Sequence, residues 1–574
     1  MAERSNKGMD KGLTSYGDAG FSRFLRRAFI KGMGYSEDSL SRPVIGIADT
    51  GSGYNACHGN MPDLIAAVTR GVQMAGGLAV PFPTISLHES FSHPTSMYLR
   101  NLMSMDTEEM IRAQPMDAVV LIGGCDKTVP AQLMGAASAN VPAIQLVTGP
   151  MLTGSHRGGV VGACTDCRRF WAAFRADEVD ETEIAEVNEQ LVPGVGTCSV
   201  MGTASTMALI AEALGIALPG SACAPAVSAE RRRIAEDTGR QAVRLAAEGV
   251  RPTDIMDRRA IENALRVLLA IGGSTNGIIH LTAIAGRLGI RIDLEAVDRM
   301  ARETPVLVNL KPSGSHYMQD LEAAGGLVRI LHEIRDLLHL DAPRVDGRTL
   351  GEVLDQNIPD WPQDVVRTRS NPIYPEGGLA LLKGSLAPNG AIIKQSAASS
   401  ELMVHEGRAV VFAGLEDLAN RLDDPDLDVA ADDVLVLQNI GPKGAPGMPE
   451  AGLIPIPKKL ARQGVKDMVR ISDGRMSGTA SGTIVLHVSP ESVGDGPLGL
   501  ARTGDLIRLD VPNRRLDLLV PEAELAARSA DVPDHATGTA RGYRRLYLDE
   551  VLQAEDGVDF AFCQPPMTEI APNS

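Results

Sequence analysis

Aromatic residues and positive charge are both scarce in this chain of 574 residues. Phe, Trp and Tyr together make up 3% of the sequence, and the formal net charge is −17. Nucleic acids and anionic membranes are bound through basic surfaces, so the acidic balance argues against both as principal partners. An anionic small molecule would need a local positive charge or a metal ion at its binding site.

Long apolar runs are absent as well. No segment approaches the roughly 18 uninterrupted apolar residues of a transmembrane helix, and residues 1–18 lack the apolar core of a secretory signal. The seven cysteines are odd in number and widely spaced, which favours reduced thiols or metal ligands over a disulfide framework. We therefore expect a cytoplasmic globular protein.

The first two thirds of the chain alternate short apolar runs with helical periodicity, the pattern of an α/β domain. Buried strands are predicted in RPVIGIADT (42–50), DAVVLIGG (117–124) and VPAIQLVTG (141–149). Helices are predicted at 61–77 and 202–214, with further long helices between 228 and 300.

The composition changes near NPIYPEGGLALLKGSLAPNG (371–390), which is rich in Pro and Gly. Beyond it the chain reads as short strands separated by turn signals, a pattern typical of a small β-barrel or sandwich. We therefore predict an α/β domain over 1–375 and a β-barrel domain over 376–574.

Three cysteines lie where a loop leaves a predicted strand or enters a predicted helix: Cys57 in DTGSGYNACHGN, Cys125 in LIGGCDKTVP and Cys198 in GVGTCSVMGTAST. Such loops meet at the carboxyl edge of an open α/β sheet, where ligands bind. Three thiolates can hold an iron–sulfur cluster and leave one iron position free. The alternative is that all three are small buried thiols that pack like alanine.

The other cysteines carry weaker signals. Cys164 and Cys167 form a CxxC, but without a second pair or a thioredoxin-like context its spacing predicts little. Cys223 and Cys563 have no polar neighbours and are expected to be structural. Three histidines lie near the cysteine loops: His58, His88 and His93. We expect each to be structural or to donate a hydrogen bond to a ligand residue.

Several carboxylates accompany these cysteines. Asp126 follows Cys125 directly, Glu89 lies in LHESFSHPTSMYLRN, and Glu450 lies in the glycine-rich loop GPKGAPGMPEAG. Carboxylates favour Mg²⁺ whereas thiolates favour iron, zinc or copper, so two different metals side by side are one hypothesis. The alternative for each carboxylate is a helix cap or a surface ion pair. Lys127 would repel a cation as an ammonium, but as a carbamate it offers an anionic oxygen.

A second glycine-rich loop, ISDGRMSGTASGT (471–483), has a backbone that can approach a ligand closely. Its candidate side chains are Ser472, Asp473, Arg475, Ser477 and Thr479. No GxxxxGK[ST] motif occurs in the chain, so a P-loop is not expected.

Taken together and in order, Cys57, GGCDKT, GTCSVMGTAST, GGSTN, GPKGAPGMPE and SDGRMSGTASG resemble the dihydroxy-acid and sugar-acid dehydratase family over essentially the whole chain. The resemblance implies an α/β domain that holds a [2Fe–2S] cluster and Mg²⁺, closed over by a C-terminal β-barrel domain. It implies a homodimer or a dimer of dimers.

Carried onto matching positions, the resemblance makes the cluster ligands Cys57, Cys125 and Cys198. It makes the Mg²⁺ ligands Glu89, Asp126, Glu450 and a carbamylated Lys127. Ser477 would be the general base as an alkoxide, with Thr479 beside it. Mg²⁺ would stabilise the charge that develops on removal of the C2 proton, and the open iron would assist loss of the C3 hydroxyl without redox change. From three cysteines alone, a [4Fe–4S] cluster with one open iron is equally consistent.

Two branches of the family compete. GCDKT in place of GCDKN, and SDGRMSGT in place of the GRFSG form, resemble the enzymes of aldonic acids such as arabinonate, xylonate or gluconate. The alternative is a dihydroxy-acid dehydratase of branched-chain amino-acid biosynthesis; the 6-phosphogluconate dehydratases are more remote. A non-enzymatic iron–sulfur carrier or sensor would use the same cysteines but would not require the four Mg²⁺ ligands.

Overall fold

The N-terminal half of the chain is built on a parallel four-stranded sheet with strand order β2-β1-β3-β4. The computed structural model describes residues 7–13, 16–494, 496–529 and 540–566. The strands are β1 Val44–Asp49, β2 Leu78–Pro83, β3 Ala118–Gly123 and β4 Ala143–Val147. β1, β3 and β4 confirm the three strands predicted from the sequence. β3 and β4 are completely buried and mainly apolar; the polar Gln145 of β4 is hydrogen-bonded inside the core.

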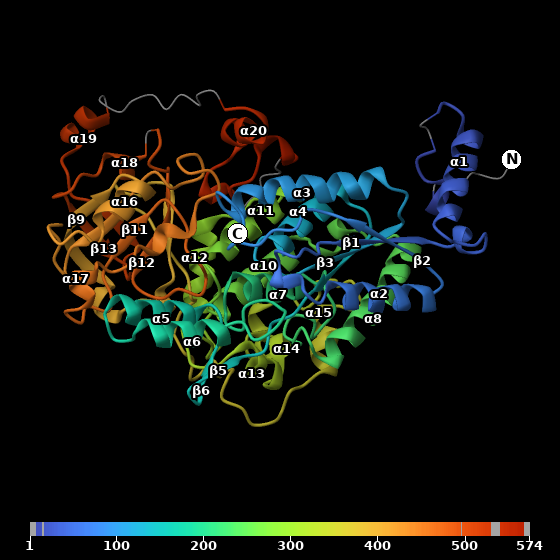
Figure 1. Ribbon diagram of the computed structural model, residues 1–574, viewed down its shortest axis with the longest axis horizontal. Coiled ribbons are helices and arrows are strands. Elements are labelled where there is room, and N and C mark those ends of the chain that lie inside the picture. The colour runs from blue at the N-terminus through green and yellow to red at the C-terminus, as the bar shows by residue number, and fades with distance from the viewer. Residues whose placement is uncertain (1–6, 14–15, 495, 530–539, 567–574) are drawn as a thin grey trace.

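Helices cover both faces of this sheet (Figure 1). α2 (Met61–Met74) packs against α8 (Ala229–Glu248), and α3 (Ser96–Ala113) packs against α4 (Thr128–Ala139). The predicted helix 61–77 is α2, which stops before Gly76 because that residue has a φ of 83°. The predicted helix 202–214 is α7 (Thr203–Ala213).

A large apolar core joins these layers to the helices that follow them. α10 (Arg258–Ala270) and α11 (Asn276–Arg287) lie in this core and confirm that helices fill 228–300. The end of the chain returns to the same core through α20 (Gly542–Glu550), which contributes Tyr547, and through Phe560. Figure 1 shows α20 beside α3.

The C-terminal region holds an eight-stranded sheet with order β14-β13-β9-β10-β11-β12-β8-β7. Its strands are β7 Ala380–Leu382, β8 Gly390–Ile393, β9 Val404–Phe412, β10 Val434–Leu437, β11 Arg470–Ser472, β12 Ile484–Ser489, β13 Leu506–Asp510 and β14 Arg515–Leu518. A bridge between Lys383 and Arg515 links the two edges, so the sheet is nearly closed. The predicted barrel is supported to that extent.

The middle of this sheet is parallel, whereas short strands separated by turn signals would be expected to form antiparallel hairpins. β9, β10, β11 and β12 are parallel neighbours, and parallel strands need crossover connections. α16 (Leu415–Arg421) lies in the connection from β9 to β10, and α17 (Lys458–Ala461) in that from β10 to β11. The division at residue 375 stays a prediction. Within the described residues, no helix has the length and apolar character needed to cross a membrane.

Candidate active site

Three carboxylates from separate parts of the chain meet at one point. Glu89 lies between β2 and α3, Asp126 lies between β3 and α4, and Glu450 begins the short 3-10 helix η7 (Glu450–Leu453). One oxygen of each lies within 4.8 Å of the others. Three anionic oxygens at this spacing form a donor set suited to a hard divalent cation.

Lys127 points its amine into this group and is completely buried. Its Nζ contacts Asp126 Oδ2 and lies 3.6 Å from Glu89 Oε2 and 4.0 Å from Glu450 Oε1. The predicted ligands Glu89, Asp126, Lys127 and Glu450 are therefore brought together. The buried ammonium of Lys127 offsets the negative charge of the three carboxylates, as a bound divalent cation would.

Arg475, from the SDGR loop, ties this group to the C-terminal region. It is completely buried, its Nη1 lies 2.6 Å from Glu450 Oε1, and its Nη2 lies 3.2 Å from each Glu89 carboxylate oxygen. The same Nη2 donates to Thr95 Oγ1 at 2.6 Å. Arg475 was among the side chains that the sequence offered to a ligand on this loop, but its contacts with Glu89 and Glu450 were not predicted.

The two glutamates respond differently to this environment. For Glu89 burial raises the pKa, but the charges of Arg475 and Lys127 and hydrogen bonds from Ser96 and Thr95 outweigh it, so the pKa lies well below its usual value. For Glu450 burial dominates and raises the pKa. A bound cation would favour the ionised form of both.

The predicted thiols gather beside the carboxylates. Cys57, in the 3-10 helix η3 (Ala56–His58), hydrogen-bonds with Cys125 at the end of β3, and this bond lowers the Cys57 pKa to about 6. Cys125 Sγ also lies 3.3 Å from Asp126 Oδ1, so the sulfur and oxygen groups adjoin. Cys198 Sγ lies 3.4 Å from Cys164 Sγ, a neighbour that the sequence analysis set aside as part of a weak CxxC.

His58 fixes the backbone of the cysteine loop. Its Nε2 accepts hydrogen bonds from the amides of Gly124 at 3.0 Å and Cys125 at 3.2 Å, and Nδ1 lies 2.8 Å from the Thr50 carbonyl oxygen. An Nε2 that accepts two amide hydrogens requires a neutral ring with its proton on Nδ1. Burial lowers the His58 pKa to about 4, in agreement with that state.

Ser477 and Thr479 lie together on the loop after β11. Ser477 Oγ is 2.9 Å from Thr479 Oγ1, and Arg168 of α5 (Thr165–Arg175) donates from Nε to Thr479 Oγ1 at 3.3 Å. Thr165 Oγ1 donates to the Thr479 carbonyl at 3.1 Å. Arg168 is a further residue near the predicted base that sequence reasoning missed.

The other side of this loop rests on buried polar groups. Asn276, from the GGSTN motif, donates to the Met476 carbonyl at 3.1 Å. A Cβ at Gly478 would lie 2.6 Å from Ser274 Cβ and 3.0 Å from the Thr203 amide, so only glycine fits there. Lys394 Nζ lies 3.4 Å from the Gly478 carbonyl, and burial lowers the Lys394 pKa to about 7.

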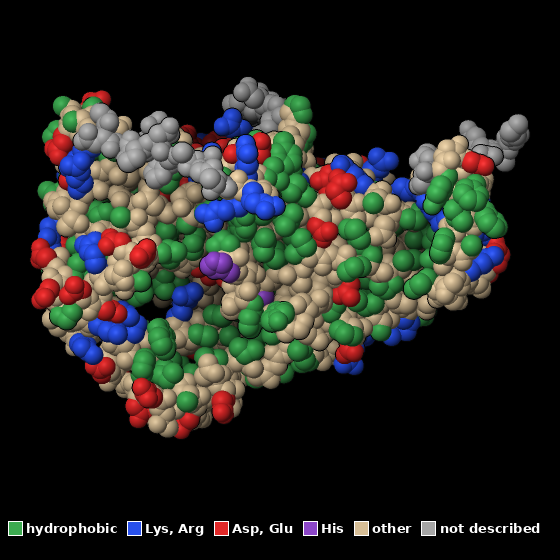
Figure 2. Space-filling view, turned by 45° about the horizontal axis from the view of Figure 1, so that its top comes forward, with side chains coloured by type: hydrophobic (Ala, Val, Ile, Leu, Met, Phe, Trp, Pro, Cys, Tyr) green, Lys and Arg blue, Asp and Glu red, His purple; other side chains and the backbone are tan. Residues whose placement is uncertain are grey.

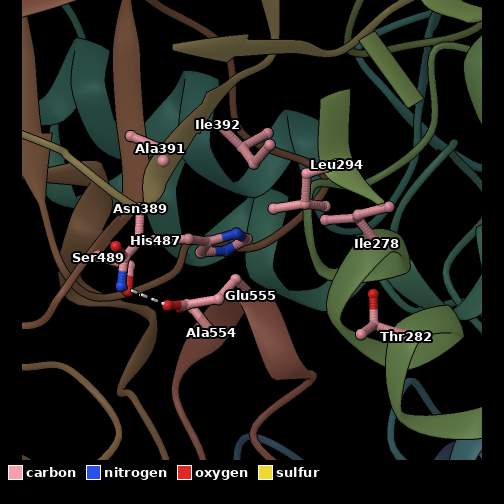
Figure 3. Close-up of a pocket in the computed structure, with 11 residues that line it drawn as sticks. Ile278, Thr282, Leu294, Asn389, Ala391, Ile392, His487, Ser489, Ala554 and Glu555 are labelled. Atoms are coloured by element: carbon pink, nitrogen blue, oxygen red, sulfur yellow. Dashed lines mark hydrogen bonds between the residues drawn. The ribbon is translucent and has the colours of Figure 1, made fainter. Parts of the chain in front are cut away.

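An enclosed cavity lies elsewhere, between α11, β8 and β12 (Figure 3). His487 points into it, and burial lowers the His487 pKa to about 3. The cavity measures about 10 Å³, which is the space of one water molecule. A cavity of that size cannot hold a sugar acid. The carboxylate and thiol groups are the candidate site because their donor atoms converge.

Two protein-family models together match nearly the whole chain. Residues 42–353 match the dihydroxy-acid/6-phosphogluconate dehydratase N-terminal model, and residues 364–558 match the corresponding C-terminal model. The chain belongs to the dihydroxy-acid/6-phosphogluconate dehydratase family. The resemblance drawn from the motifs is thereby confirmed, and the family supports a hydro-lyase enzyme.

Within the family, the chain is similar to three dehydratases named for sugar-acid substrates. An L-arabinonate dehydratase of Rhizobium leguminosarum bv. trifolii is 45% identical over 95% of both chains. An L-arabonate dehydratase of Azospirillum brasilense is 46% identical over 94% of both, and a 6-deoxy-6-sulfo-D-gluconate dehydratase of Pseudomonas putida is 44% identical over 92% of both. Dihydroxy-acid dehydratases match less closely, at 37% and 40% identity for two of them.

Proposed function

We propose that the protein is an aldonate dehydratase, which removes water from C2 and C3 of a sugar acid to form a 2-keto-3-deoxy acid. The observation that carries the proposal is the junction at Cys125, Asp126 and Lys127, where a sulfur donor group adjoins an oxygen donor group. The relatives whose names specify sugar-acid substrates support the choice of substrate class over 2,3-dihydroxyisovalerate.

The oxygen group fits Mg²⁺. Glu89, Asp126 and Glu450 supply hard anionic donors, and no sulfur belongs to this set. Lys127 fits as a carbamate, because its buried amine lies among these carboxylates and a carbamate would add a fourth anionic oxygen.

The sulfur group fits an iron–sulfur cluster. Cys57, Cys125 and Cys198 would hold a [2Fe–2S] cluster with one iron position open, since soft thiolates favour iron. When bound, the two metal centres supply Lewis-acid assistance, Mg²⁺ at the substrate carboxylate and C2 hydroxyl and the cluster at the C3 hydroxyl.

Ser477 takes the C2 proton in this account. The electron pair of the C2–H bond forms the C2–C3 double bond as the C3–O bond breaks. The departing hydroxide takes the proton that Ser477 holds and leaves as water, which restores the ionised serine. The enol that remains tautomerises to the 2-keto acid. Thr479 orients Ser477, and Arg168 adds a positive charge that favours the ionised serine.

A carrier or sensor would need only the sulfur group. The burial of Lys127 among three carboxylates has no role in electron transfer, and we therefore favour the enzyme. Anaerobically purified protein should convert an aldonate to its 2-keto-3-deoxy acid, lose this activity with a chelator of Mg²⁺, and recover it on Mg²⁺ addition. Activity that persists without Mg²⁺ would contradict the assignment of the oxygen group.

We expect the homodimer or homotetramer that the family resemblance implies. Several large apolar side chains on α1 (Ala19–Gly32) and just after it are exposed, including Phe24 at 67% and both Phe29 and Met33 at 76%. Figure 2 shows hydrophobic side chains gathered in this region, at the right of the molecule. Light scattering after size-exclusion chromatography should give a multiple of the chain mass. A cytoplasmic location stays a prediction.

A further inference from the structure

We propose that Cys164 is a fourth thiol ligand of the cluster, bound at the iron that Cys198 holds and displaced when substrate enters. The inference rests on the proposed function, because it needs a cluster held by Cys57, Cys125 and Cys198. It assigns a role to one cysteine of the CxxC that the proposed reaction leaves unused.

The sulfur atoms carry the argument. Cys164 Sγ and Cys198 Sγ lie 3.4 Å apart. Two thiolates on one tetrahedral metal, each about 2.3 Å from it, lie about 3.8 Å apart. The pair therefore needs only a small adjustment to bind one iron. Cys57 and Cys125 are likewise near enough for the Cys125 thiol to lower the Cys57 pKa, which supplies a second pair of thiols for the second iron of a [2Fe–2S] cluster.

The segment on both sides of Cys164 is firmly anchored through Asp166, two residues after it. Asp166 is buried, and its carboxylate accepts from Lys311 Nζ at 3.0 Å, Tyr317 Oη at 2.9 Å and the Gly162 amide at 2.9 Å. Tyr317 Oη also lies 3.0 Å from the Val160 carbonyl oxygen. These contacts, within the 160–166 segment and from the 311–317 segment, fix the backbone that delivers Cys164 to Cys198.

The residues after Cys164 face the predicted base. Thr165 and Arg168 both hydrogen-bond to Thr479, two residues beyond Ser477. Cys164 therefore lies between the ligand Cys198 and the loop of Ser477, where a substrate that reaches both would pass. A thiolate in this position would leave the iron with its own electron pair, so displacement changes no oxidation state.

Cys167 provides a matched control. It lies one turn further along α5 and contacts Cys164, but it packs against the apolar cluster of Val161, Phe170, Val187 and Leu191. A ligand role for Cys164 alone predicts that Cys167 is dispensable. A dithiol role for the CxxC predicts that both are needed.

The test compares wild type, Cys164→Ser, Cys164→Ala and Cys167→Ser, all purified anaerobically. Resonance Raman and EPR spectra of the cluster, with and without a saturating aldonate, report its ligands independently of turnover. We expect the substrate-free Cys164 variants to differ from wild type, and substrate to alter the wild-type spectrum more than theirs. Their clusters should bleach several-fold faster in air, because the open iron is unprotected. Cys167→Ser should match wild type in both assays.

Other outcomes would overturn the inference. Spectra and bleaching rates of the Cys164 variants that equal those of wild type would exclude ligation by Cys164. Equal changes in Cys167→Ser would point to a dithiol. Loss of the cluster from both Cys164 variants, with an unchanged circular dichroism spectrum, would make Cys164 a permanent ligand rather than a displaceable one. A colourless wild-type protein would instead refute the cluster on which the proposed function depends.

Discussion

Arg168 Nε donates a hydrogen bond to Thr479 Oγ1 at 3.3 Å, and that oxygen lies 2.9 Å from Ser477 Oγ. A guanidinium has donors only, so the Thr479 oxygen accepts from it and can direct its own hydrogen to Ser477. This arrangement stabilises negative charge on Ser477 and connects α5 to the chemistry of the loop after β11.

Replacing Arg168 should therefore raise the pKa of Ser477. Arg470, Arg475 and Lys394 are further cationic residues on or beside this loop, and all three are retained in the variant. The rate rises with pH as Ser477 ionises, so the acidic limb of the kcat profile of Arg168→Gln should move to higher pH. We expect kcat near neutral pH to fall about tenfold or more. Arg168→Lys should restore part of the rate and part of the pH profile. An unshifted profile in Arg168→Gln would contradict a role for Arg168, acting through Thr479, in stabilising the ionised Ser477.

Ser477→Ala should abolish turnover while the metals stay bound. Loss of a general base costs about 10²- to 10⁴-fold in kcat. The measurements are 2-keto acid formation and the visible absorbance of the cluster. Ser481→Ala is the matched control, since Ser481 belongs to the same loop and is exposed. A Ser477→Ala enzyme as active as this control would remove Ser477 as the base.

Arg475→Met should destabilise the protein most when Mg²⁺ is absent. The change leaves the partly buried Glu89 and Glu450 without their guanidinium partner. Breaking a fully buried ion pair costs about 3–5 kcal/mol, which is an upper bound for this site. Mg²⁺ should recover part of the loss, because it supplies positive charge to the same carboxylates. Thermal unfolding with and without Mg²⁺ tests this.

The control for that experiment is Arg508→Met. Arg508 pairs with Glu406 at the surface, where both side chains are about half exposed, and such pairs contribute at most about 1 kcal/mol. A loss in Arg475→Met no larger than in the control would show that Arg475 does not hold the two regions together.

Lys394→Met should stabilise the protein in a pH-dependent way. Burial lowers the folded-state pKa of Lys394 from 10.5 to about 7, so the unfolded chain binds the extra proton between these values. The free energy of unfolding of the wild type therefore rises with pH across this window. The destabilisation by the buried Lys394 amine is complete below pH 7. Each pKa unit corresponds to about 1.4 kcal/mol.

The gain in melting temperature of Lys394→Met over wild type should then be larger at pH 6 than at pH 9. Lys466→Met, at an exposed site paired with Glu178, should show no such difference. Equal gains for Lys394→Met at the two pH values would mean that Lys394 is not buried as an uncompensated amine.

The meeting of the two donor groups was predictable because it depends on strand ends. Cys57 follows β1, and Cys125, Asp126 and Lys127 follow β3, its parallel neighbour. Parallel strands present their carboxyl ends at one edge, so short motifs after them converge. The sequence also predicted the α/β region correctly, because its strands are short segments dominated by apolar residues.

Contacts between distant segments were not predictable in the same way. Arg475 reaches Glu89 across 386 positions of the chain, and Cys164 reaches Cys198 only because the anchored segment before α5 folds over the site. The letters of a CxxC or an SDGR motif do not indicate which distant residues these side chains will contact. The parallel order of β9 to β12 was likewise missed, since short strands with turn signals resemble hairpins.

The substrate preference tests the central claim most directly. We would measure kcat/KM for 2-keto acid formation by anaerobically purified, Mg²⁺-supplied protein on pentonates, hexonates and 2,3-dihydroxyisovalerate side by side. The proposed function predicts a clear preference for an aldonate. A preference for 2,3-dihydroxyisovalerate would contradict it and assign the protein to the branched-chain biosynthetic branch of the family.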